Sequence, residues 1–175
     1  MDKIWIACFD IGKKNFAFVI EEINIKSLKK IENIKKNERY KKDGLSTKIF
    51  SELLSKVYKS SKIILLKNLD LTKNCNDSKY LDPKIYINMI DTLDKYTSYW
   101  DKCSAFIIEQ QMSFGRKKQN TMAIKLGQHC YSYFSFYYRD FKLLLEFPSY
   151  YKTNIIGAPK NTKGLKNKSN RKKWR

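Results

Sequence analysis

The sequence has few cysteines and a single histidine, which limits the metal and redox chemistry that it can carry. The cysteines are scattered without a CxxC pair, and His129 completes no recognisable zinc spacing with them. We therefore expect reduced and mostly buried thiols instead of a zinc site or a disulfide framework. The cysteines are Cys8, Cys75, Cys103 and Cys130.

Long apolar runs are also missing. A membrane-spanning helix needs about 18 consecutive apolar residues, and no such run occurs in the chain. The N-terminal stretch MDKIWIACFDIGKKN is no signal peptide, because its apolar part is short, carries Asp10 and lacks a small-residue cleavage site. We expect an intracellular protein without a membrane partner.

Acidic residues are scarce beside basic ones. The chain has 36 Lys and Arg against 17 acids, a net charge of +19. Such a surface repels itself unless it meets a polyanion, and nucleic acid is the usual one. A membrane surface is the alternative partner, but no basic amphipathic helix with a clean apolar face stands out. A lysine-rich genome explains part of the lysine content but not its uneven distribution along the chain.

The rest of the composition is that of a folded domain. Apolar residues make up 42% of the 175 residues and aromatic residues 14%, enough for one domain with a hydrophobic core. We expect a core domain over residues 1–160, with an insertion helix at about 46–58, and a basic tail or the start of a truncated final helix over 161–175. The hydrophobic patterns predict strands at 3–9, 16–25, 62–66, 104–108 and 142–147, helices at 46–58, 82–100 and 120–138, and a loop at 31–44.

This order predicts an α/β fold, a mixed sheet of roughly five strands flanked by helices. Ser46 or Thr47 is expected to cap the first helix. Asp82 caps the second, with Pro83 in its first turn, and one apolar face continues to Trp100. The last helix is expected to turn Ile124, Cys130, Phe134 and Tyr137 toward the core. Its aromatic run at 131–138 favours packing or a dimer surface over stacking on unpaired bases.

Two carboxylates fall at the ends of apolar strands. Asp10 follows IACF and Glu109 follows AFII. Active sites of open α/β sheets gather at the carboxyl ends of strands, so the two side chains converge if their strands are neighbours. Converging carboxylates oppose each other without a cation, and Mg²⁺ is the natural hard ion for oxygen ligands. The alternative is that Asp10 starts a turn and Glu109 caps the next segment.

The residues around both acids resemble a known family. FDIGKKNFAF and FIIEQQM resemble the RuvC-type branch of the ribonuclease-H-like superfamily. The stretch IIEQQMSFGRKKQNTMAIKLGQHCYSYF looks most like the Holliday junction resolvases of poxviruses and related large DNA viruses, and the likeness extends over roughly residues 3–174. It implies that Asp10 and Glu109 are catalytic ligands of Mg²⁺, or of Mn²⁺ in its place.

The resemblance also implies a substrate and an assembly. The chain is expected to act as a homodimer on four-way junctions and other branched viral DNA, without a small-molecule cofactor. Cleavage would leave 3′-hydroxyl and 5′-phosphate ends during recombination and repair at a replication site in the host cytoplasm. The stretch PSYYKTNIIGAPKNTKG resembles the strand that carries an active-site lysine, which makes Lys152 the catalytic candidate for steadying the pentacovalent phosphate. A phosphate-contacting surface role for Lys152 is the alternative.

Further polar residues are candidates for binding nucleic acid. Gln111 lies beside Glu109, and the basic residues before the next helix make its N-terminus a ready anion site. A solvated loop is the alternative for this cluster. Lysines of the basic tail match the loop of the family that enters the DNA. The candidates are Gln111, Arg116, Lys117, Lys118 and Asn120, together with Lys160, Lys163, Lys166 and Lys168.

The sequence departs from the family in its acids. The family completes its metal site with two more acids, about one helical turn apart, on a final helix. Here the last acid is Glu146, and residues 147–175 contain nine Lys or Arg and no acid. Asp140 and Glu146 precede the lysine strand and do not match those positions. The final helix is therefore expected to be missing, because the chain is a fragment, because it is a naturally shortened binding protein, or because a partner subunit supplies the acids.

Three functions stay open at this point. The first is a Mg²⁺-dependent, structure-selective endonuclease that resolves Holliday junctions. The second is a non-catalytic DNA- or RNA-binding module on the same fold, which the two absent acids favour. The third is another ribonuclease-H-like enzyme, such as a nuclease for RNA–DNA hybrids.

Overall fold

The computed structural model describes residues 2–41, 46–75, 82–111 and 121–148. These residues form two compact units. The sheet unit contains residues 3–22 and the described part of 62–148, and the helical insertion contains Asp2 and the described part of 23–61.

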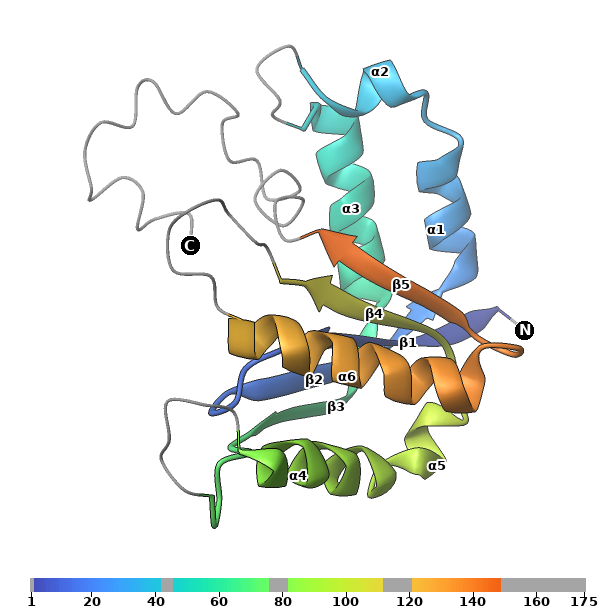
Figure 1. Ribbon diagram of the computed structural model, residues 1–175. Coiled ribbons are helices and arrows are strands. Elements are labelled where there is room, and N and C mark those ends of the chain that lie inside the picture. Colours follow the sequence, from blue (N-terminus) through green and yellow to red (C-terminus); the bar gives the residue numbers. More distant parts are fainter. Residues whose placement is uncertain (1, 42–45, 76–81, 112–120, 149–175) are drawn as a thin grey trace, which may run out of the picture. The chain divides into compact units, whose positions relative to one another are not determined.

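The sheet unit is built on a five-stranded mixed sheet (Figure 1). Its strands lie in the order β3-β2-β1-β4-β5. β4 pairs in parallel with both β1 and β5, whereas β2 and β3 pair antiparallel. The predicted α/β class and mixed sheet are therefore confirmed. The strands are β1 (Lys3–Asp10), β2 (Phe16–Asn24), β3 (Lys62–Leu69), β4 (Cys103–Gln110) and β5 (Leu143–Pro148).

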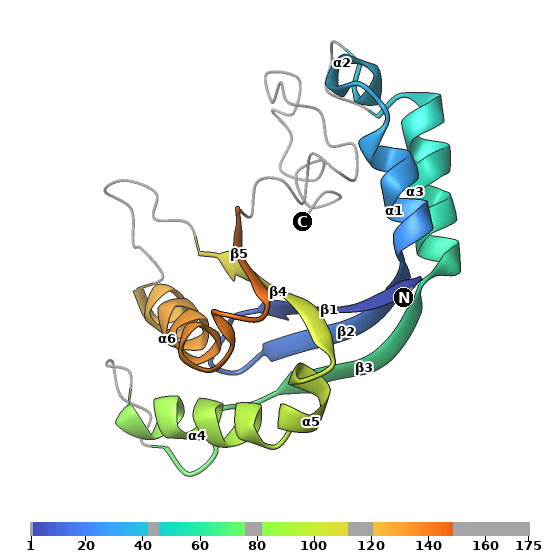
Figure 2. The same cartoon turned by 90° about the vertical axis from the view of Figure 1, so that its right-hand side faces the viewer.

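Three helices of this unit lie on one face of the sheet, as the two views of the ribbon show (Figures 1 and 2). They are α4 (Pro83–Asp94), α5 (Thr97–Trp100) and α6 (Thr121–Tyr138). The alternate residues of each central strand point to this face and are buried, as the period of a strand dictates. The strand residues buried in the core cluster are Ala7 and Phe9 of β1, Phe16, Phe18 and Ile20 of β2, and Cys103, Phe106 and Ile108 of β4.

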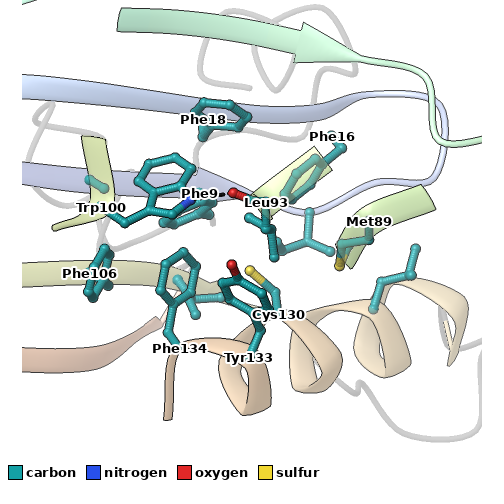
Figure 3. Packing of buried hydrophobic residues seen from close by; sticks show 14 of the residues in the cluster. Phe9, Phe16, Phe18, Met89, Leu93, Trp100, Phe106, Cys130, Tyr133 and Phe134 are labelled. Atoms are coloured by element: carbon teal, nitrogen blue, oxygen red, sulfur yellow. Dashed lines mark hydrogen bonds between the residues drawn. The ribbon is translucent and has the colours of Figure 1, made fainter. Parts of the chain in front are cut away.

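Aromatic rings fill the space between the sheet and the helices (Figure 3). The rings of Phe106 on β4 and Phe134 on α6 stack with their centroids 4.2 Å apart. Phe9 of β1 lies 4.9 Å from the same Phe134 ring. The indole of Trp100 is fully buried, and its Nε1–H donates to the carbonyl oxygen of Leu93 at 2.7 Å. This core holds β1 and β4 against α6 and so fixes the strand ends that carry the candidate acids.

The predicted helices of the sheet unit are largely confirmed. Asp82 caps α4 by accepting from the backbone N–H of Lys84 at 2.8 Å, and Pro83 stands in the first turn. The expected single helix to Trp100 is wrong, because it breaks after Asp94 and restarts as α5 at Thr97. On α6, Cys130 and Phe134 are buried as expected. Tyr137 is not, being 56% exposed, and the neighbouring Tyr138 is buried in its place.

The helical insertion contains α1 (Ile25–Glu32), α2 (Lys36–Arg39) and α3 (Lys48–Ser60). The loop predicted at 31–44 is therefore wrong over the end of α1 and over α2. The helix predicted at 46–58 is confirmed, and its cap is Thr47, whose hydroxyl accepts from the backbone N–H of Phe50. Both α1 and α3 are basic and have an apolar side, so the expectation that no basic amphipathic helix stands out is also wrong.

The prediction of free thiols is confirmed by the structure. The four cysteines are free, with Cys103 and Cys130 buried and Cys8 and Cys75 half-buried. Within the described ranges, no helix combines the length and the apolar character that a membrane span requires.

Candidate functional site

The site is built on the pairing of β1 with β4. These two strands are neighbours and run in parallel, with Phe9 in register with Ile108. Asp10 and Glu109 are the next residue on each strand. The condition on which the predicted convergence depended, that the two strands are adjacent, is therefore met, and both acids stand at the carboxyl end of a parallel pair.

Both acids point away from the aromatic core. Phe9 and Ile108 are only 3% and 1% exposed, and they face α6. Because successive strand residues alternate between faces, Asp10 and Glu109 share the opposite face of the sheet. Asp10 is exposed and Glu109 is half-buried. Asp10 is therefore accessible to solvent at the end of β1, and Glu109 is partly accessible at the end of β4.

A tight, packed turn directly follows Asp10 and fixes the end of β1. Ile11 is buried, and a Cβ at Gly12 would lie 3.1 Å from the backbone oxygen of Asn15. The carbonyl of Lys13 accepts from the backbone N–H of Leu71 at 2.8 Å, which ties the turn to the chain after β3. This packing explains why glycine follows the acid two residues later, and it holds the end of β1 in place.

Of the predicted nucleic-acid contacts, only Gln111 lies in the described part of the chain. It follows β4 directly and is half-buried. Its Cγ would be 3.8 Å from a Cβ built on Gly127, so its aliphatic part lies over α6 at the position where that helix has no side chain. The other predicted residues lie outside the described residues: Arg116, Lys117, Lys118, Asn120, Lys152, Lys160, Lys163, Lys166 and Lys168.

Two other acids of the sheet unit do not join the site. Glu146 is in register with Ile108, which places it on the helix-covered face, where it accepts from the Nε2 of Gln128 on α6 at 2.9 Å. Asp140 lies before β5 and pairs with the Nε of Arg139 at 3.7 Å. Glu146 thus lies on the opposite face of the sheet from Asp10 and Glu109, and Asp140 precedes β5.

Asp70 is an acid at the same edge that the sequence reasoning missed. Asp70 directly follows β3, just as Asp10 is the last residue of β1. The apolar run before Asp70 in KIILLKNLD could have indicated another acid at a strand end. Hydrogen bonds from the hydroxyl and the backbone N–H of Thr72 hold the pKa of its carboxyl below the usual value. Because β2 lies between β3 and β1, Asp70 stands two strands away from Asp10.

Asp10 and Glu109 offer oxygen ligands of the kind that a hard divalent cation prefers. In the ranges that the structure describes, no group of three or more His, Cys, Asp or Glu residues is arranged to hold a metal ion. Asp10 and Glu109 provide two carboxylates, and Mg²⁺ keeps several water ligands when only one or two carboxylates bind it. Asp10 and Glu109 are therefore the described residues that could act as ligands of such a cation, with water or substrate oxygens completing its shell.

A separate cavity lies beside β3 and α4. Its volume is about 290 Å³, and it includes neither Asp10 nor Glu109. Asn88 closes one wall by donating from its Nδ2 to the carbonyl oxygens of Leu71 and Lys73, at 2.8 and 3.1 Å. The cavity is therefore distinct from the carboxylate pair. Its lining consists of Leu69, Asp70, Leu71, Lys73, Asn74, Asn88, Asp91, Thr92, Lys95 and Tyr96.

Comparison with known proteins finds similar proteins in two iridescent viruses. The chain is 34% identical to uncharacterized protein 170L of Invertebrate iridescent virus 6 over 164 residues, covering 91% of this chain and 61% of that protein. It is 28% identical to uncharacterized protein 97L of Invertebrate iridescent virus 3 over 185 aligned positions, covering 97% of this chain and 80% of that protein. The chain thus spans less than two thirds of the length of 170L. No family model and no solved structure matches.

Proposed function

We propose that the chain is the core of a ribonuclease-H-like, Mg²⁺-dependent endonuclease that resolves four-way DNA junctions. One observation carries the proposal: Asp10 and Glu109 follow the registered pair Phe9–Ile108 on adjacent parallel strands. The resemblance to the viral resolvases requires an Asp on the first strand and a Glu on the fourth to share a metal site. The adjacency of β1 and β4 supports this part of the proposal.

The chemistry follows from where the acids stand. Both carboxylates lie at the accessible end of the sheet, so they can face a phosphodiester without burying charge in the core. When bound, the divalent cation would activate water and stabilise the leaving oxygen. Asp10 and Glu109 would hold the cation, and the packed turn at Gly12 would keep Asp10 in position. Lys152 is assigned to the developing charge of the phosphate, on the resemblance alone.

The substrate and assembly are part of the same proposal. A four-way junction has two symmetric cut sites, which a homodimer matches, and twofold symmetry is the commonest oligomer symmetry. The net charge of +19 supports a polyanionic substrate.

The second candidate is a binding module without catalysis. It is favoured by the absence, within the described ranges, of a third acid beside Asp10 and Glu109. Such a module would bind junctions without needing a divalent cation.

The experiment is a nicking assay with a labelled four-way junction in the presence of Mg²⁺ or EDTA. Wild type is compared with Asp10→Asn, and Asp91→Asn serves as the matched control, because it removes an exposed carboxylate from α4. Linear duplex and an RNA–DNA hybrid are run as competitors at moderate salt, since nonspecific phosphate binding depends on salt. We expect symmetric Mg²⁺-dependent nicking that Asp10→Asn abolishes and Asp91→Asn retains.

The other outcomes separate the candidates. Tight junction binding without nicking favours the binding module. Preferred cleavage of the RNA–DNA hybrid favours a hybrid nuclease. If the chain neither prefers junctions nor nicks them, the resolvase proposal is wrong.

A further inference from the structure

The excess positive charge is not spread over the molecule. The described residues of the sheet unit contain twelve Lys and Arg against eleven acids. The described residues of the insertion between β2 and β3, within 23–61, contain ten against three. A bias of the genome toward lysine would enrich the sheet unit and the insertion in lysine to a similar extent. The insertion therefore carries an excess of positive charge that the sheet unit lacks. We attribute this difference to a polyanionic partner.

The folded insertion turns its lysines outward. Lys26, Lys29 and Lys30 lie on one side of α1, at helical spacings of three and four residues, and all are exposed. On α3 the exposed Lys48, Lys56 and Lys59 likewise share one side. We name these residues together the lysine faces of the insertion.

The opposite sides of the two helices are used in packing. The Oγ of Ser60 at the end of α3 lies 3.5 Å from that of Ser27 on α1, so the two helices run antiparallel, as Figures 1 and 2 also show. Phe50 and Val57 on α3 are buried. The apolar residues of α1 are half-buried and not fully covered, so the charged sides are the more exposed surface of the two helices.

The lysine faces are only partly compensated, because Glu52 lies on the same side of α3, four residues from both Lys48 and Lys56. In the part of the insertion that the structure describes, the one ion pair joins the Nζ of Lys26 to the carboxylate of Asp2 at 3.0 Å. Arg39 differs from the lysines, since its guanidinium donates to the carbonyl oxygens of Ile34 and Glu32 at 3.0 and 3.3 Å and so completes the turn after α1. Repulsion among uncompensated lysines disfavours the free protein, and a polyanion relieves it.

We propose that the α1–α3 insertion is a second binding surface for duplex DNA, which contacts backbone phosphates through its lysine faces without reading sequence. This inference rests on the proposed function, because DNA is the polyanion that the proposed function supplies. An anionic lipid surface is the rival partner, since Ile49 and Tyr58 on α3 are also exposed. The packed apolar sides favour DNA, because a helix that lies on a membrane must insert its apolar side.

The test compares two matched triple variants. Lys29→Gln, Lys30→Gln and Lys59→Gln remove three charges from the insertion. Lys62→Gln, Lys84→Gln and Lys95→Gln remove three exposed lysines from the sheet unit. A third variant carries arginine at positions 29, 30 and 59, which keeps the charge and the helix propensity. Fluorescence anisotropy with a labelled 30-base-pair duplex and with a four-way junction gives dissociation constants over a range of salt.

We expect the insertion variant to bind at least about tenfold more weakly at about 100 mM salt, with the salt slope reduced by about 0.9 for each phosphate that the variant no longer neutralises. The sheet variant and the arginine variant should bind as wild type does. Circular dichroism confirms that the helices are retained.

Four results would overturn the inference. If wild type binds DNA and the insertion variant binds equally well, the insertion is not a DNA surface, although the proposed function stands. If both glutamine variants weaken DNA binding equally, the insertion is not a distinct DNA surface. If the insertion variant keeps its DNA binding and loses only its binding to phosphatidylserine vesicles, the partner of the insertion is a lipid surface and not DNA. If wild type binds no DNA at all, the proposed function fails together with the inference.

Discussion

The four cysteines differ in their surroundings although they are equally isolated in the sequence. Burial raises the pKa of the Cys103 thiol to about 12 and raises that of Cys130 as well. A raised pKa means that these thiols keep their protons at pH values where a free thiol begins to ionise. Because the thiolate is the reactive form, both residues should be inert in the folded protein.

This predicts the pattern of alkylation by iodoacetamide at about pH 8. Cys103 and Cys130 should stay unmodified in the native protein and react fully in guanidinium, as peptide mass spectrometry would show. The half-buried Cys8 serves as the internal comparison. Fast labelling of Cys130 in the native state would mean that α6 does not pack tightly on the sheet.

The sequence could identify Asp10 and Glu109 as candidate site residues, but it could not show that they lie on adjacent strands. Each acid follows an apolar strand, which is a local signal. Their proximity depends on which strands pair, and β1 pairs with a strand almost a hundred residues away in sequence. The face that Glu146 occupies could not be read locally either, because a shift of one residue in the pairing of β5 with β4 would move it to the other side of the sheet.

At the scale of elements, end signals predicted helices better than apolar patterns did. Asp82 caps α4 through the backbone N–H of Lys84, at 2.8 Å from its Oδ1. Replacing a capping Asp by Ala costs about 0.5–2 kcal/mol of stability. We therefore expect Asp82→Ala to lower the free energy of unfolding by about 1 kcal/mol.

Urea denaturation followed by circular dichroism measures this change. Asp82→Asn is the matched control, since the amide oxygen retains the acceptor, and it should unfold close to wild type. If both variants lose the same stability, the charge of Asp82 and not its cap bond is what matters.

The helices that were missed or misjudged have physical explanations. The apolar side of α1 is short, with Ile25, Leu28 and Ile31 between lysines, so it did not stand out as a helix. The apolar face from Ile85 to Trp100 continues across the break between α4 and α5, because both helices pack on the same core. A periodic pattern therefore recorded the shared face but not the interruption.

At the scale of the whole molecule, the class of fold follows from the order of the elements, but its division into two units does not. The insertion could be recognised as one helix, yet the pairing of α1 with α3 and the burial of Phe50 and Val57 become visible only in the structure. The sheet unit, by contrast, has a nearly balanced charge and a continuous aromatic core. The charge of the chain is therefore best understood by unit and not as a single total.

The separation predicts that the sheet unit folds without the insertion. Every member of the main core cluster lies in the sheet unit, and none lies in residues 23–61. Glu22 on β2 and Lys62 on β3 are directly opposite each other in an antiparallel pair. Replacing residues 23–61 by Asn-Gly should therefore close a β-hairpin, because a two-residue turn of this type matches the twist of the strands.

The shortened protein is expected to melt cooperatively and to keep the near-ultraviolet circular dichroism of the buried Trp100, which reports on the aromatic core. Trp100→Ala in the full chain shows what the loss of this signal looks like. A shortened chain with helical far-ultraviolet signal but no cooperative transition would mean that the insertion is required for the sheet to pack. A cooperative transition would instead show that the insertion is dispensable for the folding of the sheet unit.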